Sequence, residues 1–522
     1  MNPVTQPPSQ DASLMDRREF LRGVAAGATL TAAGLAGAPQ SAAAAAPAPA
    51  APHAPPFAAI QIGPHTILDE GIDHCLELLQ DTAAVNCLMV YSHSYHSDFR
   101  KPPQLVATDH GLATRPSPSR KLPSVWIRQH DQFFKNTALR HQKLDSSFTY
   151  ADRDLFAELA APARKRGMKL YARILEAKGP TVAREIDNFS RIQTVDIFGR
   201  TATVGCWNHP DYINFWTATA EDMFSNYDLD GLQFGAERCG PLMNVLLARA
   251  DVAPACFCEH CQARGRARGI DPDRARQGYE NLYNYARSLK TDRPAPADGV
   301  FACFLRILLR HPEILSWEYQ FRLAREEVLQ AIYKSVKTIK PGAVVGWHVD
   351  HQATSFDLVA RAELSYEEAA AYSDFIKLVA YHDILGPRVR FWYLDLLQKG
   401  VLAEVPLEDS LSLYYDLLGY DKNTEPKLAA LEKTGFSPDY VYRLTKQSVA
   451  SAAGKTKILT GVGFDIPWNS TLMPADPEKI YQSVLKSFEA GAAGVVASRE
   501  YEEMRMPSLR AFGRAIRELA AK

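Results

Sequence analysis

Short apolar, β-rich runs alternate with longer stretches of helical periodicity from about residue 57 to the end of this 522-residue chain. Strands of a parallel sheet covered on both faces read as such near-continuous apolar runs, and helices are the usual connections between them. This alternation predicts an α/β protein, a (β/α)8 TIM barrel with long βα-loop insertions. A doubly wound open sheet is the alternative, but the chain has no glycine-rich phosphate-binding fingerprint.

Eight runs are the expected strands: 85–91, 169–175, one within 192–207, 231–234, 344–349, 375–381, 457–464 and 494–498. Helices are expected where apolar residues recur every three to four positions, at 155–166, 210–226, 315–339 and 477–490. Asp476 and Pro477 begin the last of these as N-cap and first helical residue. Long insertions are expected at 97–147 after the first strand, at 239–310 after the fourth and at 385–436 after the sixth.

The first 56 residues have the order of an export signal rather than that of a folded domain. Residues 16–22 (DRREFLR) resemble the twin-arginine export motif, an Ala/Gly-rich apolar run follows at 23–37, and an Ala tract then offers A-x-A cleavage sites. The resemblance implies a signal peptide at 1–46, a Pro/Ala linker at 47–56 and a single barrel at 57–522. The alternative is a disordered Ala/Pro tail with a chance arginine pair.

These features set the expected partners and location. The twin-arginine export machinery is the expected partner of the N-terminus, and the mature protein is expected in the bacterial periplasm or outside the cell. The apolar run is too short and too rich in glycine to span a membrane well, so no stable membrane insertion is expected. The formal net charge is −1, from 59 basic and 60 acidic side chains, which argues against a nucleic-acid partner.

Polar and aromatic side chains follow nearly every predicted strand, where TIM barrels carry their chemistry. Carboxylates there can cleave glycosidic bonds, and aromatic rings stack on sugars. Each such residue alone can also be a helix cap or an ion-pair partner, so the coincidence over many strand ends carries the prediction. The candidate catalytic residues are Glu237, Asp465, Asp350, Asp383 and Glu500. The candidate substrate-binding residues are Tyr91, His93, Arg173, Glu176, Trp207, Asn208, His209, Arg238, His348, Tyr381, His382, Trp468 and Arg499.

Glu237 follows residues 230–234 (DGLQF), which resemble the fourth strand of many sugar-cleaving barrels. The resemblance implies a catalytic carboxylate at Glu237, often the acid/base, and a nucleophile after the seventh strand, here Asp465. Asp350, Asp383 and Glu500 are the alternatives to Asp465. Amylase-like and galactosidase-like barrels have an Asp where this chain has Gly235, so an Asp nucleophile on the fourth strand is not expected.

Three cysteines in the pattern C-x-C-x-x-C, Cys256, Cys258 and Cys261, have a spacing that can wrap a tetrahedral metal. The motif resembles the structural zinc site of family 42 β-galactosidases, which implies a fourth cysteine from before the strand-four glutamate. Cys206 fits that role, and Cys239 and His260 compete for it. A disulfide or reduced thiols are the other interpretations. The remaining cysteines, Cys75, Cys87 and Cys303, are expected in the core.

An all-thiolate site leaves no open metal position, so the expected zinc is structural and no cofactor is expected for the chemistry. Several segments also resemble uncharacterised glycosidase-like TIM barrels of bacteria. They are residues 195–210, Glu237 with Arg238, the cysteine motif, and the last strand with its continuation at 495–504. This resemblance implies a fold and a reaction class but no particular sugar.

The function expected from these features is an exported glycoside hydrolase that acts on a carbohydrate substrate and cleaves O-glycosidic bonds with two carboxylates. One alternative is a carbohydrate-binding barrel without catalysis, which would lack a close carboxylate pair. Another alternative is a metal-dependent hydrolase or lyase that uses a histidine-rich rim. The histidines of that rim would be His93, His96, His209, His348 and His382.

Overall fold

The computed structural model describes residues 55–94, 106–107, 109–111, 121–176, 182–247, 252–290, 294–469 and 471–522. The predicted signal peptide, all but the last two residues of the predicted linker, and His96 lie outside the described residues. No described helix combines the length and the apolar composition that a membrane crossing requires.

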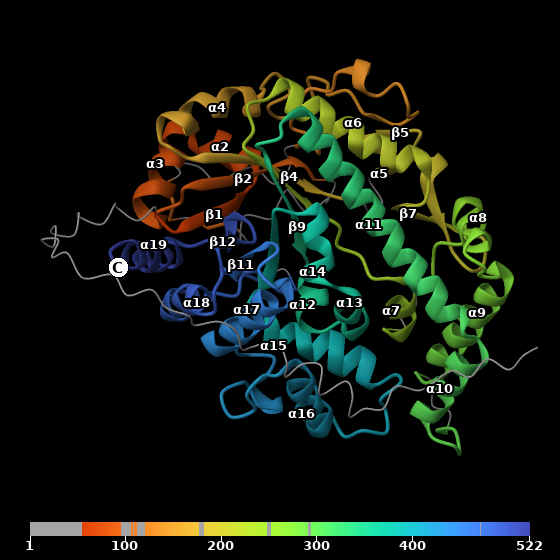
Figure 1. The fold of residues 1–522 in the computed structure, drawn as a ribbon. Coiled ribbons are helices and arrows are strands. Elements are labelled where there is room, and N and C mark those ends of the chain that lie inside the picture. Colours follow the sequence, from red (N-terminus) through yellow and green to blue (C-terminus); the bar gives the residue numbers. More distant parts are fainter. Residues whose placement is uncertain are drawn as a thin grey trace, which may run out of the picture. The chain divides into compact units, whose positions relative to one another are not determined.

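Eight parallel strands close into a barrel, which confirms the predicted (β/α)8 architecture. In barrel order from the N-terminus they are β1 (Phe57–Ile62), β2 (Cys87–His93), β4 (Lys169–Leu175), β8 (Gly231–Gly235), β9 (Val344–Val349), β10 (Phe375–Ala380), β11 (Lys457–Gly463) and β12 (Gly494–Ser498). The first and last strands pair directly, with Phe57 opposite Gly494 and Ile60 opposite Ala497. Figure 1 shows this closure, with β1 in red beside β12 in blue.

One predicted barrel strand lies outside the barrel, and one barrel strand was not predicted, so the predicted number of eight strands is still correct. The segment within 192–207 forms β6 (Gln193–Val195) and β7 (Thr201–Gly205), an antiparallel pair outside the barrel. Most of its side chains are partly or fully exposed, unlike those of a strand covered on both faces. The missed strand is β1, whose Ala pair gives a weak β signal directly after the Pro/Ala segment. The strand before 97–147 is therefore the second of the barrel.

Helices cover the outside of the barrel and return the chain between its strands (Figure 1). These helices are α2 (Pro64–Glu70), α3 (Ile72–Ala83), α4 (Leu155–Lys165), α6 (Pro210–Asn226), α11 (Glu313–Ile339), α17 (Pro438–Ala452), α18 (Pro477–Glu489) and α19 (Met506–Ala520). The four helices predicted from periodicity correspond to α4, α6, α11 and α18. Asp476 caps α18 by accepting from the Glu478 backbone N–H at 2.9 Å, as predicted.

The loops after four strands carry additional elements. After β2 lie η3 (Asp131–Phe133) and β3 (Arg140–His141), and after β4 come α5 (Val182–Glu185), β5 (Ile186–Asp187), η4 (Phe189–Ile192), β6 and β7. After β8 come α7 (Pro241–Leu246), α8 (Glu259–Ala267), α9 (Pro272–Ser288) and α10 (Val300–Arg310). After β10 come α15 (Leu385–Arg388), η6 (Val389–Gln398), α16 (Leu407–Leu418) and η7 (Leu428–Ala430).

Five short elements in the loops after β9 and β12 complete the list. After β9 lie α12 (His351–Ser355), α13 (Leu358–Glu363), α14 (Tyr366–Ala369) and η5 (Ala370–Tyr372), and after β12 lies η8 (Tyr501–Glu503). Because α12, α15 and η6 follow the carboxyl ends of neighbouring strands, they contribute walls to the space above the barrel.

Side chains that point into the barrel change from apolar to polar toward its carboxyl end. Ala59, Tyr171 and Phe375 belong to a buried apolar cluster. Two residues further along the same strands, and therefore on the same face, are Gln61, Arg173 and Lys377. All three are at most 2% exposed. The strand period thus brings buried polar side chains, two of them basic, to the floor of the space above.

Candidate active site

A cavity of about 380 Å³ opens at the carboxyl end of the barrel. Residues in or after seven of the eight strands line it, from β2 to β12. The predicted site residues among them are Tyr91, Arg173, Glu237, His348, Asp350, Tyr381, Trp468, Arg499 and Glu500. The fold therefore gathers in one cavity residues that are more than 400 positions apart in the chain.

Glu237 lies two residues beyond β8, and its Oε1 lies 3.3 Å from Nε2 of His348 on β9. Burial, with help from nearby Lys377, lowers the pKa of His348 to about 3, so the ring is neutral at neutral pH. Lys377 Nζ lies 3.5 Å from His348 Nδ1 and is a donor there, which leaves the ring proton on Nε2. His348 therefore donates to Glu237 without supplying a positive charge.

Lys377 is buried inside the barrel, and its Nζ also donates to the Tyr381 hydroxyl at 3.1 Å. Burial lowers the pKa of Lys377 well below its ordinary value, and Arg173 lowers it further. Gly461 on β11 makes room for this side chain, because a Cβ there would lie 2.3 Å from Lys377 Cε. The glycine and the lysine thus form one structural unit beneath the cavity.

Glu500 follows β12 and meets a different set of partners. Its Oε1 accepts a hydrogen bond from the Tyr91 hydroxyl and lies 3.9 Å from Arg173 Nη1. Arg173 also stacks on the Tyr91 ring, 4.1 Å from the ring centroid. A nearby guanidinium and a donated hydrogen bond both favour the ionised form of a carboxylate. The surroundings of Glu500 therefore suit an anion better than those of Glu237.

Asp350, His351 and Arg388 form a third side of the cavity. Asp350 caps α12, accepting from the Ala353 backbone N–H at 2.9 Å. Arg388 Nη1 lies 2.6 Å from His351 Nδ1 and donates to it. The aromatic rings of Trp392 and Trp468 complete this wall.

Two predicted catalytic carboxylates, Asp465 and Asp383, do not line the cavity. Asp465 is fully buried: its Oδ1 accepts from Arg505 Nε and from the Ala475 N–H, and its Oδ2 accepts from the Arg505 N–H. Asp383 Oδ2 accepts from the Ile466 N–H at 3.2 Å, and burial raises the pKa of its carboxyl to about 7. Their contacts tie loops together beneath the rim.

Glu176, Trp207 and Arg238 meet in a separate buried cluster. Glu176 Oε1 accepts from Trp207 Nε1 at 2.8 Å and lies 2.7 Å from Arg238 Nη2. The Arg238 guanidinium lies over the Trp207 ring, 3.7 Å from a ring centroid. None of the three lines the cavity, so the structure separates them from the other predicted residues.

The remaining predicted residues also lie elsewhere. His93 packs against His141, His382 is buried, and His209 caps α6 and lies beside His260. Asn208 Nδ2 donates to the Cys261 sulfur at 3.2 Å. Among the described residues, the histidines proposed for a metal-binding rim do not converge on one point; the group with suitable geometry for an ion is the cysteine cluster below.

Sequence reasoning missed several cavity residues, including Arg388, Phe356 and Trp392, and it also missed the buried Lys377 beneath the cavity. A lysine within the apolar run 375–380 was a usable signal, because a lone charge in a strand buried on both faces needs a purpose. Arg388 and Trp392 carried no such signal, since they lie in an insertion whose path the sequence pattern does not specify.

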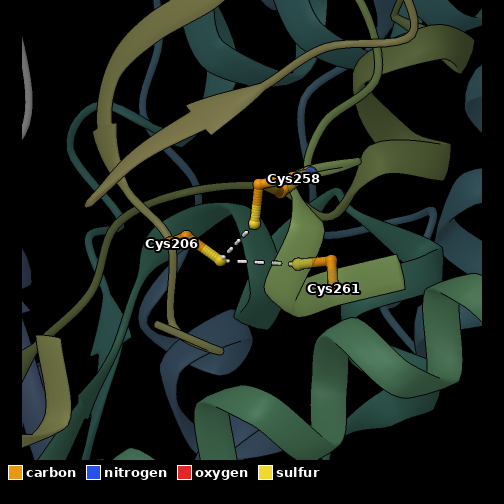
Figure 2. A group of neighbouring side chains, drawn as sticks. Cys206, Cys258 and Cys261 are labelled. Carbon is orange, nitrogen blue, oxygen red and sulfur yellow. Dashed lines mark hydrogen bonds between the residues drawn. The ribbon is translucent and has the colours of Figure 1, made fainter. Parts of the chain in front are cut away.

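Four cysteine sulfurs, those of Cys206, Cys256, Cys258 and Cys261, lie within 4.8 Å of one another. Figure 2 shows Cys206 pointing between Cys258 and Cys261, at 3.5 and 3.4 Å. These distances are too long for a disulfide and match thiolates around a tetrahedral metal, with metal–sulfur bonds of about 2.3 Å. The Val195 N–H donates to the Cys256 sulfur at 3.3 Å. The competitors Cys239 and His260 are not in the group.

No protein-family model matches the chain, and no match was found among curated proteins. A solved β-galactosidase from the haloarchaeon Halorubrum lacusprofundi matches with a TM-score of 0.50 and 11% identity, covering 89% of this chain and 58% of that one. A β-galactosidase from Marinomonas ef1 has a TM-score of 0.47 and 10% identity, covering 89% and 59%. One from Rahnella sp. R3 has 0.45 and 12%, covering 90% and 55%.

This chain therefore spans less than two thirds of the length of each of these three enzymes. At such low identity the likeness to the Halorubrum lacusprofundi enzyme shows a shared barrel fold. Function has to be argued from the cavity itself.

Proposed function

We propose that this protein is a glycoside hydrolase that cleaves O-glycosidic bonds with Glu237 and Glu500. The observation that carries the proposal is that both carboxylates line one cavity at the carboxyl end of a barrel whose fold β-galactosidases share. They follow β8 and β12, four strands apart in either direction around the closed barrel, so they approach a substrate from opposite walls. Aromatic rings on the same cavity suit a sugar ring.

The two carboxylates have different partners, which supports different roles. Glu500 accepts from Tyr91 and lies close to Arg173, so it is the group held ionised, as nucleophile or as the base for water. Glu237 faces a neutral histidine and is the proton donor to the leaving oxygen. In each turnover the donor loses a proton to the departing sugar or alcohol and regains it from water.

The test is hydrolysis of α- and β-linked aryl glycosides and oligosaccharides by the purified protein, with Glu237→Gln, Glu500→Gln and the exposed control Glu432→Gln. Both cavity variants should lose about 10²- to 10⁴-fold in kcat/KM, and the control should keep its activity. Glu237→Gln should lose least on 2,4-dinitrophenyl glycosides, whose leaving group departs without protonation. Glu500→Gln should lose equally on all substrates.

Equal activity of wild type and both variants would contradict the assigned residues but not the reaction class. Binding of sugars without hydrolysis of any glycoside would favour a carbohydrate-binding barrel instead. If a glycoside is cleaved, NMR of the anomer first released separates retention from inversion of configuration. Carboxyl groups about 5 Å apart are typical of retaining enzymes, and separations of about 6.5–9.5 Å are typical of inverting enzymes.

We further propose that the four cysteines bind a structural Zn²⁺. The donor set supports this: four thiol sulfurs lie within 4.8 Å of one another, with backbone and amide N–H groups donating to them. The metal would stabilise the insertions and supply no chemistry to the cavity.

We also propose that the protein is exported through the twin-arginine pathway to the periplasm or beyond. Its support is the order of the first 46 residues: an arginine pair at Arg17 and Arg18, an Ala/Gly-rich run and an Ala tract.

A further inference from the structure

Arg388 is a basic residue on the cavity wall, and among the described residues it has no carboxylate ion-pair partner. It ends α15, lines the cavity and donates to His351 Nδ1 at 2.6 Å. Asp383 and Glu237 attract it through space, but within the part of the chain that the structure describes no acidic side chain forms an ion pair with it. The three cavity carboxylates are engaged elsewhere: Glu237 with His348, Glu500 with Tyr91 and Asp350 at the start of α12.

Neighbouring arginines differ from Arg388 in this respect. Arg499 makes two hydrogen bonds to Glu503, at 2.6 and 3.1 Å. Arg390, two residues further along, contacts Asp395 and Glu432. His351 does not replace such a partner, because burial lowers its pKa well below the ordinary value and the ring is neutral. Among the described residues, the charge of Arg388 is therefore met only through space, by Asp383 and Glu237, and not by a direct ion pair.

A second guanidinium offers a free donor to the same cavity. Arg173 is 2% exposed, and its Nη1 makes no hydrogen bond although it lies 3.9 Å from Glu500. A buried charged donor without an acceptor destabilises the folded protein unless a ligand supplies the acceptor. Trp392 and Trp468 lie on the same cavity and provide ring faces. The combination of aromatic surface and guanidinium groups suits a ligand that carries both a sugar ring and a negative charge.

We infer that the cavity selects an anionic sugar, a hexuronate, and that Arg388 is the residue that recognises its carboxylate. A guanidinium binds a planar carboxylate through paired N–H donors, which gives both affinity and orientation. A sulfate ester offers the same charge and is the other source of this chemistry. The sugar part of the inference rests on the proposed function, whereas recognition of the anion rests on Arg388 alone.

The experiment measures binding by titration calorimetry to the full-length protein for three sets of matched sugars. These are glucuronate and galacturonate, the neutral glucose and galactose, and their 6-sulfates. Wild type should bind at least one uronate about 10- to 100-fold more tightly than its neutral counterpart. Arg388→Gln should lose that preference while keeping its weaker affinity for neutral sugars, which also shows that it is folded. Arg390→Gln is the matched control and should keep the preference.

The outcomes separate the two proposals. Equal affinity for charged and neutral sugars, or a preference that survives in Arg388→Gln, would overturn the inference. A stronger preference for the 6-sulfates, lost in Arg388→Gln, would support it with sulfate as the anion. If uronates bind through Arg388 but no uronide is cleaved, the inference holds and the proposed hydrolase function fails. If neutral glycosides are cleaved without any charge preference, the proposed hydrolase function holds and the inference about Arg388 fails.

Discussion

At the scale of single residues, the groups that a strand-end carboxylate contacts decide whether it faces the cavity or stabilises a loop. Glu237 and Asp465 both follow barrel strands, yet Glu237 lines the cavity and Asp465 is closed off by Arg505 and a backbone N–H. Asp465 also has a left-handed backbone with φ of +52°, which turns the chain at this point. Such contacts stabilise the loop, and they leave no oxygen directed at a substrate.

The structural role of Asp383 can be tested by the pH dependence of the protein's free energy of unfolding. Its pKa of about 7 in the folded protein lies above the roughly 3.9 of an unfolded aspartate, so folding favours its protonated form. Its contribution to the free energy of unfolding is complete below about pH 4 and is lost as the pH rises through 7. Asp383→Asn stays neutral and should gain, relative to wild type, about 3 kcal/mol between pH 5 and pH 8.

Denaturant unfolding of both proteins at pH 5 and pH 8 measures this difference. The exposed Asp416→Asn is the control and should shift stability equally at the two pH values. An Asp383→Asn variant with the same stability difference at both pH values would show that the wild-type carboxyl does not titrate in this range. Loss of glycosidase activity in a stable Asp383→Asn protein would instead return Asp383 to the catalytic candidates.

At the scale of elements, the cysteine cluster joins two insertions that belong to different barrel loops. Cys206 directly follows β7, in the loop between β4 and β8, whereas Cys258 is the N-cap of α8, in the loop between β8 and β9. Figure 1 shows α8 and α9 beyond the end of α11, away from the barrel strands. Few barrel contacts hold such an outlying group of helices, so a local link would contribute to its stability.

The metal proposal predicts about one zinc per chain by elemental analysis of the purified protein. Removal of the metal by a chelator, or the substitution Cys258→Ser, should lower the melting temperature on the order of 5 °C, because binding energy at a structural site is folding energy. Cys303→Ser, outside the cluster, should change neither zinc content nor melting temperature. A zinc-free protein with fewer than eight titratable thiols would indicate a disulfide and contradict the metal site.

At the scale of the whole molecule, the barrel depends on its first strand. β1 pairs with β12 on one side and with β2 on the other, so its loss would leave two unpaired strand edges and expose the interior. The residues before β1 are expected to serve export, not folding. If the export proposal holds, the boundary between the two functions is expected close to Phe57.

Two truncations test this boundary. A protein that begins at Pro55 should fold with the melting temperature and activity of the full-length chain. A protein that begins at Pro64 lacks β1 and should be unfolded or insoluble. The strand pairing and burial lost with β1 should exceed the free energy of unfolding of a typical protein, about 5–15 kcal/mol. Circular dichroism and size-exclusion chromatography report both. A folded, active Pro64 protein would contradict the role of β1 as the closing strand.

The fold class could be predicted from the sequence because both of its signals are local. Apolar runs such as 457–464 and the capped helix after Asp476 read directly as strand and helix, and seven of the eight barrel strands were found this way. The cysteine group was also predicted, since three of its members lie within six residues and only Cys206 had to come from elsewhere. The place of Glu237 at the cavity could be predicted because Glu237 follows a recognisable strand.

Tertiary structure alone decided which polar strand ends share a cavity. Glu500 and Tyr91 are 409 positions apart, and their contact exists only because β12 closes onto β1 and β1 onto β2. Arg388 enters the cavity from an insertion, where periodicity carries no information about direction. In the sequence, Asp465 and Glu176 look equivalent to the carboxylates that line the cavity. In the structure they bind Arg505 and Arg238, which lie in loops elsewhere in the chain. Periodicity reports burial along one element, whereas a catalytic constellation depends on how elements distant in sequence meet.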